Sequence, residues 1–343
     1  MSRPLVPLLS GTLPAALGLL ALGALAAGLA LFAGSAELGA ARVWAALRGQ
    51  GDPVAHAIVW QLRAPRVVLA LAVGGGLAVV GVAMQALVRN PLAEPYLLGV
   101  SSGASAGAAL FYLGFLPAVA SRALTMPLAA VLGAWLAVTL VFVIARKGTH
   151  LSTARLLLAG VALSSLLAAV TAFVTFASPS PDRLRAVLFW LLGSLAGARW
   201  SAVWAPLGAS LAGTAALWLL ARPLDLLTTG EEPAAALGVP VEALKRGLLL
   251  LAALVTGVLV AASGVIGFVG LIVPHAVRLA AGVPHRRVVP LAFAAGAVFL
   301  VLADLAARTV LAGQEVPVGV LTALCGVPFF LALLRRADRL SGV

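Results

Sequence analysis

The residues that most often carry chemistry are sparse in this sequence and lie outside catalytic patterns. It contains no Gly-Lys dipeptide, so it lacks a phosphate-binding loop of the form G-x-x-x-x-G-K-[ST]. A single cysteine, Cys325, excludes an internal disulfide and argues against a cysteine-based zinc site. No two histidines have the i, i+4 spacing of a helical metal site; they are His56, His150, His275 and His285. We therefore expect no catalytic residue, no metal site and no cofactor bound by this chain.

Serine and aspartate positions support the same expectation. The serines at 101–102 and 152 lack the neighbouring His and Asp that would complete a nucleophilic site. Asp304 is the only aspartate well inside an apolar run, where ionisable residues are functional candidates by default. Arg308 lies four residues further on, so we expect the two to form an ion pair on one helix face.

The composition places the chain in a membrane. Of its 343 residues, 62% are hydrophobic and 10% charged, whereas a soluble domain carries about 25% charged residues. A spanning helix needs about 20 apolar residues, so this length holds about ten helices with their loops. The sequence therefore excludes a soluble enzyme and predicts an all-α membrane protein with a single transmembrane domain over 1–343.

Ten apolar segments carry this prediction. They cover 13–33, 67–88, 97–115, 124–145, 156–177, 201–221, 248–262, 265–281, 288–303 and 316–334. The first invites comparison with a removed signal peptide, but it is longer than the about 7–15 residues of a signal core, so a spanning helix is favoured. A shorter segment at 186–196 is predicted to form a re-entrant or interfacial helix.

The net charge of +12 has a topological explanation. The 23 Lys and Arg outnumber 11 Asp and Glu, and they lie at the ends of apolar runs without a basic face, which argues against nucleic acid as a partner. By the positive-inside rule they favour cytoplasmic N and C termini. Arginines on the outer side need another role, such as binding an acidic partner or an anionic ligand. Arg63 and Arg66 have no acidic residue within a helical turn.

Glycines and a proline mark close packing and a helix break. Gly99, Gly103 and Gly107 recur every fourth residue, which predicts three glycines on one helix face and close approach of a neighbouring backbone. The segment 265–281 is interrupted by glycines and contains a proline, so we expect a discontinuous span that lines a cavity. His275 follows this proline, and we expect it to have a buried, hydrogen-bonded structural role.

Longer motifs resemble the permease subunits of bacterial ATP-binding-cassette importers for vitamin B12, ferric siderophores and haem. They are RAPR at 63–66, RNPLAEPYLLGVSSG at 89–103, LLLAG at 156–160, FWLLGSL at 189–195, GFVGLIVPH at 267–275 and EVPVG at 315–319. The resemblance runs along nearly the whole chain. One departure is Ala64, where the family usually has leucine.

The resemblance implies a type II importer permease fold, with ten helices per subunit and a homodimer whose pathway follows its two-fold axis. Two ATP-binding-cassette ATPase subunits, which carry ATP and Mg, would dock on the cytoplasmic side. A periplasmic binding protein would dock on the opposite side. The resemblance also implies a multi-pass protein of the bacterial inner membrane, surrounded by lipid, with no ATPase activity of its own.

Residues that match the family's motifs take the family's roles as expectations. The segment 222–245 becomes the cytoplasmic coupling segment, and the residues expected to contact the ATPase are Leu227, Gly230, Glu231 and Leu237. The cytoplasmic gate is assigned to Asn90, Leu92, Ser152 and Thr153. Docking of the binding protein is assigned to Arg63, Arg66 and Arg308.

Haem is the substrate that the resemblance favours. The run DRLR at 182–185, followed by Phe189 and Trp190, is most similar to the haem-importing branch. This similarity assigns Arg183 and Arg185 to the substrate pathway, because an arginine at the outer mouth suits the propionates of haem. Ferric siderophores are the next alternative, and cobalamin is the third.

A rival from another class is a secondary transporter driven by protons or sodium. Such a transporter needs carboxylates embedded in the membrane as coupling sites. Asp304 beside Arg308 gives that alternative thin support.

Overall fold

The computed structural model describes residues 12–34, 38–117, 124–148, 150–178, 181–311 and 314–341, most of them helical. The first half forms α1 (Thr12–Phe32), α2 (Ala40–Leu47), α3 (Pro53–Ala57), the π-helix η1 (Ile58–Arg63), α4 (Ala64–Val88), the 3-10 turn η2 (Pro95–Leu98), α5 (Val100–Tyr112), α7 (Met126–Ala145) and α8 (Thr153–Phe176). Between α7 and α8, β1 (Arg146–Lys147) and β2 (His150–Leu151) pair as a short antiparallel hairpin.

The second half continues as helices. They are α9 (Pro181–Leu191), α10 (Trp200–Leu219), α11 (Ala221–Thr229), α12 (Glu231–Ala236), α13 (Val241–Ser263), α14 (Val269–Ala281), α15 (His285–Thr309) and α16 (Val318–Ser341). Among the described residues, 7 helices are long and apolar enough to cross a membrane, and α14 and α16 contain shorter apolar stretches. The prediction of an all-α membrane protein with about ten spanning segments is confirmed, since every predicted segment contains a helix.

Several helix boundaries differ from the prediction. The short helix was expected at 186–196, but α9 runs from Pro181 to Leu191. Proline suits a first helical turn because its φ is already helical and its missing N–H is not needed there. The chain also remains helical from Pro53 to Val88, across the π-helix η1. The second predicted segment began at residue 67, whereas Arg63 and Arg66 before it already lie on this continuous helix.

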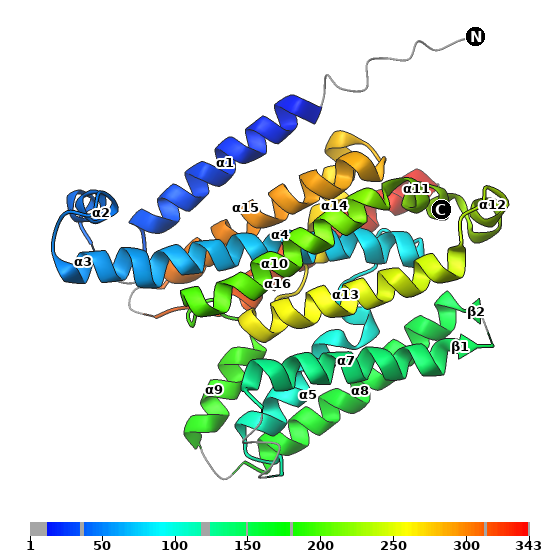
Figure 1. The fold of residues 1–343 in the computed structure, drawn as a ribbon, viewed down its shortest axis with the longest axis horizontal. Coiled ribbons are helices and arrows are strands. Elements are labelled where there is room, and N and C mark those ends of the chain that lie inside the picture. The colour runs from blue at the N-terminus through cyan, green and yellow to red at the C-terminus, as the bar shows by residue number, and fades with distance from the viewer. Residues whose placement is uncertain are drawn as a thin grey trace.

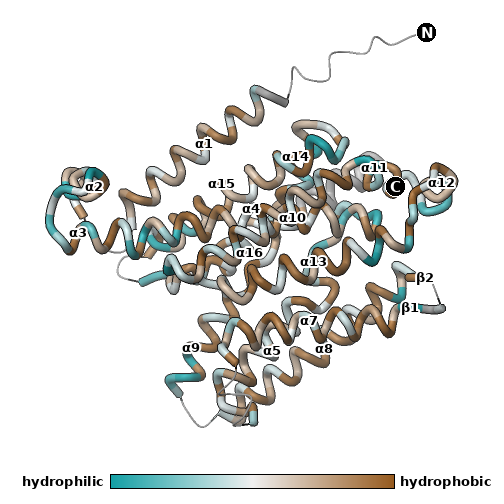
Figure 2. The backbone as a smooth tube through the Cα atoms, in the orientation of Figure 1, coloured by the Kyte–Doolittle hydropathy of each residue, from teal (hydrophilic) through white to brown (hydrophobic). Residues whose placement is uncertain are grey.

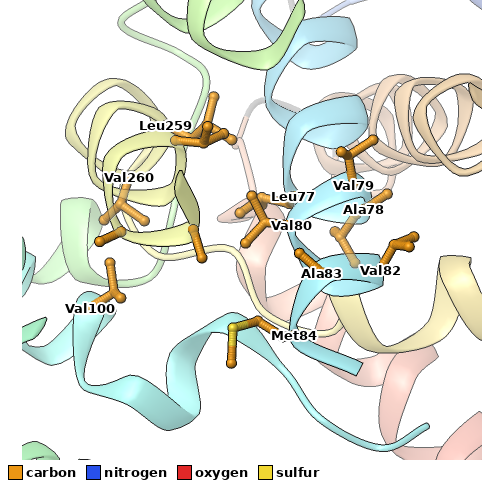
Figure 3. Packing of buried hydrophobic residues seen from close by; sticks show 14 of the residues in the cluster. Leu77, Ala78, Val79, Val80, Val82, Ala83, Met84, Val100, Leu259 and Val260 are labelled. Carbon is orange, nitrogen blue, oxygen red and sulfur yellow. The ribbon is translucent and has the colours of Figure 1, made fainter. Parts of the chain in front are cut away.

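Helix α4 forms the centre of the bundle (Figure 1). In the 18-residue apolar stretch of the helix that contains α4, 89% of the residues are buried, compared with 11% in the corresponding stretch of the N-terminal helix α1. Figure 3 shows Leu77, Val80 and their neighbours on α4 facing the surrounding helices. Because lipid tails are as apolar as leucine, helix association in a membrane depends on close van der Waals packing.

Glycines on α4 provide that close packing. A Cβ at Gly74 would collide with the carbonyl oxygen of Gly296 on α15, and one at Gly81 would collide with that of Gly270 on α14. At Gly76 it would strike Ser210 of α10. Three different helices thus approach the α4 backbone at positions that exclude any side chain.

The glycine face predicted for 99–107 is corrected in one respect. Gly103 and Gly107 do pack against the backbone of α7, at Gly133 and Ala129. Gly99 instead has φ of 74° and precedes α5 as its N-cap. A left-handed conformation of this kind is accessible to glycine at little cost. Gly99 therefore begins the helix, and only the other two glycines share its packing face.

The predicted break in 265–281 lies between α13 and α14. The chain turns at Gly264 (φ 66°) and at Phe268 (φ 67°), a conformation that is unusual for a residue other than glycine. Side chains from the 89–103 motif hold this turn. The Glu94 carboxylate accepts a hydrogen bond from Phe268 N at 2.7 Å, and the Tyr96 hydroxyl donates to Ile266 O at 2.7 Å. The motif therefore fixes a distant break in the helical bundle.

Gly81 provides a test of this packing. We expect Gly81→Ala to destabilise the protein by about 1–3 kcal/mol, because the added methyl group meets a main-chain oxygen that cannot move aside alone. Gly28→Ala on α1 is the matched control, with nothing within 4 Å of an added Cβ. It should be neutral or stabilise by up to about 1 kcal/mol. Thermal unfolding in detergent measures both, and equal melting temperatures for the two variants would contradict the packing argument.

Glu94 provides a second test, based on pH. Glu94 lies between two predicted spans, and burial raises the pKa of its carboxyl above the ordinary value of 4.5, while the hydrogen bond from Phe268 opposes that shift. A carboxyl with a raised pKa stabilises the fold below its unfolded pKa, and this contribution is lost as pH rises. Glu94→Gln keeps the acceptor without the charge, so it should match or exceed the wild type in melting temperature at neutral pH.

The difference between wild type and Glu94→Gln should shrink as the pH approaches 4.5, the ordinary pKa. Glu94→Ala loses the acceptor and should be less stable than Glu94→Gln throughout. A wild type that gains stability over Glu94→Gln as pH rises would show that the carboxylate is better accommodated than its burial implies.

Candidate functional site

The predicted functional residues fall at opposite ends of the bundle. Helices α2 and α3 lie at one end in Figure 1, and α11, α12 and the β1–β2 hairpin lie at the other. Figure 2 shows hydrophilic segments at these ends and hydrophobic segments along the spans between them. The docking arginines lie near the first end, and the gate and coupling residues lie near the second.

The docking arginines are members of a buried ionic cluster, which we call the arginine cluster (Arg63, Arg66, Arg308, Asp304 and Glu315). Arg66 Nε lies 2.9 Å from Asp304 Oδ1, and Arg66 Nη1 lies 2.9 Å from Glu315 Oε2. Arg308 Nε lies 3.1 Å from Asp304 Oδ2, which confirms the predicted pair on one helix face. Asp304 is 1% exposed, so the low dielectric around it strengthens these interactions.

Two of these arginines also donate hydrogen bonds to the carbonyl oxygens at the end of α1. Arg63 Nη1 donates to Leu31 O at 2.7 Å and to Phe32 O at 3.0 Å. Arg308 donates to Ala30 O and to Ala33 O, each at 3.3 Å. The last carbonyls of a helix have no partner within the helix, and cations near them are favoured by the helix dipole. These arginines therefore attach α1 to η1 and α15.

The arginine cluster borders a cavity of about 250 Å³ whose lining includes all three arginines and Glu315. With three arginines and two carboxylates, the cluster has a formal excess of one positive charge. Arg63, Arg66 and Arg308 are only 5%, 8% and 4% exposed. A docking partner would reach these guanidinium groups through the cavity rather than across an open surface, and docking itself remains a prediction.

The gate residues lie in two turns at the opposite end. Asn90 follows Arg89, whose φ is 54°. The side-chain oxygen of Asn90 accepts a hydrogen bond from Leu92 N at 2.9 Å. Ser152 is the N-cap of α8, and Thr153 is the first residue of that helix. The Thr153 hydroxyl is buried without a hydrogen-bond partner among the described residues.

The coupling segment consists of α11, α12 and the start of α13. Gly230 joins the first two helices with φ of 135°, which favours glycine. Leu227 is fully buried, so it anchors the segment to the bundle, and it cannot itself meet an ATPase in this conformation. Leu237 is 65% exposed and is available for contact. Glu231 turns inward, with Oε2 3.0 Å from Lys245 Nζ.

The structural roles of three residues were not predicted from the sequence. Lys245 is the last residue of the predicted coupling segment, whereas the structure places it on α13, which begins at Val241 and buries it. Glu94 and Tyr96 were noted only as members of a family motif. A signal was present for Lys245, because lysine is scarce here and a lone lysine beside an apolar run requires a partner when buried.

A cavity of about 770 Å³ lies between α5, α8 and α9. Its polar lining consists of hydroxyl groups, and the lining includes no charged side chain; the hydroxyl-bearing residues are Ser101, Ser102, Ser105, Thr171, Thr175 and Ser178. Within the described part of the chain, the buried Thr175 hydroxyl has no hydrogen-bond partner. Leu184, Leu188 and Leu191 of α9 form the apolar side. The cavity suits an uncharged ligand with hydrogen-bonding groups.

Arg183 and Arg185 lie on α9 beside this cavity but are not part of its lining. Both are exposed. The face of α9 that carries Leu184 and Leu188 points to the cavity, because residues four apart share one face of a helix. The assignment of Arg183 and Arg185 to the substrate pathway stays a prediction for the assembled transporter.

Histidine positions fit the expectation of structural roles only in part. His275 is half-buried, with its ring edge-on to Phe329 at a centroid distance of 6.4 Å, so full burial was wrong. His285 is 2% exposed, and its Nδ1 lies 2.6 Å from Asp225 Oδ1. In the described part of the chain, no group of three or more potential ligands is placed to hold a metal ion.

Asp304 is the residue on which to test the arginine cluster. Asp304→Asn removes the charge that Arg66 and Arg308 share, and breaking a buried ion pair costs about 3–5 kcal/mol. Arg42→Gln is the control, because the Arg42–Asp52 pair is exposed and should matter far less. Chemical denaturation in detergent compares the two, and a similar loss in both would show that the cluster is solvated.

Comparison with known proteins places these features in a family. Residues 20–336 match the model of the FecCD transport family. The cobalamin import system permease protein BtuC of Halobacterium salinarum is 46% identical over 284 residues, which cover 83% of this chain and 75% of that protein. The vitamin B12 import system permease protein BtuC of Shigella boydii is 41% identical, over 88% of this chain and 91% of its own.

A solved structure agrees with the sequence relatives. An inward-facing transporter described as being of the metal-chelate ABC type has a TM-score of 0.82 and 32% identity, with 94% of this chain and 98% of that chain covered. The type II importer permease fold expected from the resemblance is thus confirmed. The chain belongs to the FecCD transport family and is a multi-pass permease subunit of an ABC transporter, with no ATPase activity of its own.

Proposed function

We propose that this chain is the permease of an ATP-driven importer that moves a cobalamin-type corrinoid into the cytoplasm. In this proposal it works as a homodimer with two ATPase subunits, which carry ATP and Mg. A substrate-binding protein docks at the arginine-cluster end. Both termini then lie on the cytoplasmic side, with α11 and α12 facing the ATPases.

The observation that supports cobalamin as the substrate is the hydroxyl-lined cavity between α5, α8 and α9. The periphery of a corrinoid bears many neutral amides, which exchange hydrogen bonds with serine and threonine hydroxyls. Haem instead presents two carboxylates, and a site for them would be expected to contain arginine or lysine. Relatives at 46% and 41% identity are named as cobalamin and vitamin B12 permeases, which supports the same substrate.

Haem remains the second candidate because of Arg183 and Arg185. Both are exposed on the helix that forms one wall of the cavity, with Leu184 between them in its lining. In a dimer, two copies of this helix could bring four guanidinium groups to one mouth. Ferric siderophores are the third candidate, and no described side chain favours them specifically.

The test is uptake into proteoliposomes that contain the complete importer with its cognate binding protein. We expect ATP-dependent uptake of cobalamin and little uptake of haem. The double variant Arg183→Ala/Arg185→Ala should retain cobalamin uptake, because neither residue lines the cavity. Ser105→Val/Thr171→Val should reduce it by about tenfold, as expected when two neutral hydrogen bonds of about 0.5–1.5 kcal/mol each are lost.

The opposite pattern would favour haem. Robust haem uptake that disappears in the double arginine variant, together with no cobalamin uptake by the wild type, would overturn the substrate proposal. If none of the three candidates, cobalamin, haem and ferric siderophore, moves in an ATP-dependent manner, the importer proposal itself is overturned.

A further inference from the structure

Lys245 is a deeply buried cation that belongs neither to the docking arginines nor to the gate residues nor to the residues expected to contact the ATPase. It is 2% exposed, although it lies on α13 next to a long apolar stretch. A buried ammonium group is costly unless it is paired and hydrogen-bonded. The partners that satisfy it therefore show what the position requires.

Lys245 and Glu242 hold both main-chain groups of one residue in the hairpin. Lys245 Nζ donates a short hydrogen bond to Leu151 O, and Leu151 N donates to Glu242 Oε2 at 3.0 Å. The two side chains lie three residues apart on α13, so they project from the same face. They bind the edge of β2 as a neighbouring strand would, with one donor and one acceptor.

The same ammonium group also binds the coupling helix. Lys245 Nζ lies 3.0 Å from Glu231 Oε2, at the first residue of α12. Glu231 Oε1 in turn lies 3.7 Å from Arg89 Nη2, at the end of α4. One buried nitrogen therefore connects α12 to the hairpin, and Glu231 extends the connection to the turn that contains Asn90.

These connections join elements that were assigned separate roles. Glu231 belongs to the predicted coupling segment. Leu151 directly precedes Ser152 and Thr153, which are predicted gate residues, and Arg89 directly precedes Asn90, another of them. The lysine is thus the shared contact between the surface expected to meet the ATPase and the turns expected to close the pathway.

We propose that Lys245 is a positioning residue that transmits movement of α12 to the β1–β2 hairpin and the start of α8. The transmission to a gate rests on the importer function proposed above, whereas the positioning of the hairpin does not. When α12 is displaced, the ion pair draws Lys245 and the hairpin with it, because losing Glu231 would leave the buried ammonium group with the more distant Glu242 Oε1, at 3.9 Å, as its carboxylate partner. Breaking the contact separates the two elements while leaving each of them folded.

The first experiment measures positioning in the isolated permease. Spin labels are placed at exposed positions on α8 (Ala154→Cys), α12 (Ala235→Cys) and α13 (Ala243→Cys), in pairs and with Cys325 replaced by serine. Pulsed electron–electron double resonance then gives the distributions of the distance between the two labels, from α8 to α12 and from α8 to α13.

Lys245→Met should broaden both distributions, because the hairpin loses its donor and α12 loses its ion pair. Glu231→Ala should broaden only the distribution from α8 to α12, since the bonds from Lys245 and Glu242 to Leu151 remain. The control is Arg246→Met, the loss of an exposed neighbouring charge, and it should leave both distributions narrow. Narrow distributions in Lys245→Met would overturn the proposal.

The second experiment measures transmission in proteoliposomes with the complete importer. Coupling between sites is commonly worth 5–150-fold, so we expect Lys245→Met to lower the substrate moved per ATP hydrolysed by about tenfold. Arg246→Met should match the wild type. Broadened distances with an unchanged transport ratio would overturn the transmission and leave only a structural lysine.

Failed assembly of the variant and failed transport by the wild type have different consequences. If the Lys245→Met complex does not assemble, Glu231→Ala replaces it in the transport assay, and an unchanged transport ratio there overturns the proposal. If the wild-type importer moves no substrate, the proposed function fails and with it the transmission, while the spin-label distances still decide whether Lys245 positions the hairpin.

Discussion

The close approach of neighbouring backbones to α4 is the constraint on which the rest of the structure depends. Gly74 and Gly81 allow α15 and α14 to reach the α4 backbone, at positions where even a methyl group would collide with a carbonyl oxygen. In a bilayer the helices gain little from burying apolar surface against one another, so such contacts specify which helices become neighbours. Once α4 is fixed at the centre, its two ends carry the arginine cluster and the turn at Asn90.

The two ends of the bundle use ionic contacts in different ways. In the arginine cluster, three arginines, two carboxylates and the last carbonyls of α1 satisfy one another, which attaches a weakly packed helix to the bundle. At the opposite end Lys245 and Glu231 connect short elements that have few other anchors. Buried charges are costly to separate, so both sets behave as fixed joints. The first joint lies within the main bundle, and the second lies between peripheral elements that an ATPase can reach.

The cavity between α5, α8 and α9 offers a ligand neutral groups rather than charges. Hydroxyls and apolar side chains, three leucines among them, line this cavity, and Arg183 and Arg185 are not part of its lining. Transport requires a ligand to enter and to leave, and weak neutral hydrogen bonds satisfy both conditions better than a desolvated ion pair. Beside it, the strained turn at Phe268 is held by Glu94 and Tyr96, so residues of one motif support the wall of a cavity formed largely by other segments.

The sequence by itself determined the class of the protein, the approximate number of its spanning segments and the family, because apolar length and local motifs are properties of contiguous residues. It also determined the Asp304–Arg308 pair, which is separated by a single helical turn. Only the tertiary structure decided that Arg66 binds Asp304 and Glu315, that Glu94 holds Phe268, and that Lys245 joins α12 to the hairpin. Each of these contacts joins segments that the pattern of hydrophobicity cannot place side by side, since that pattern records which residues avoid water and not which helices become neighbours.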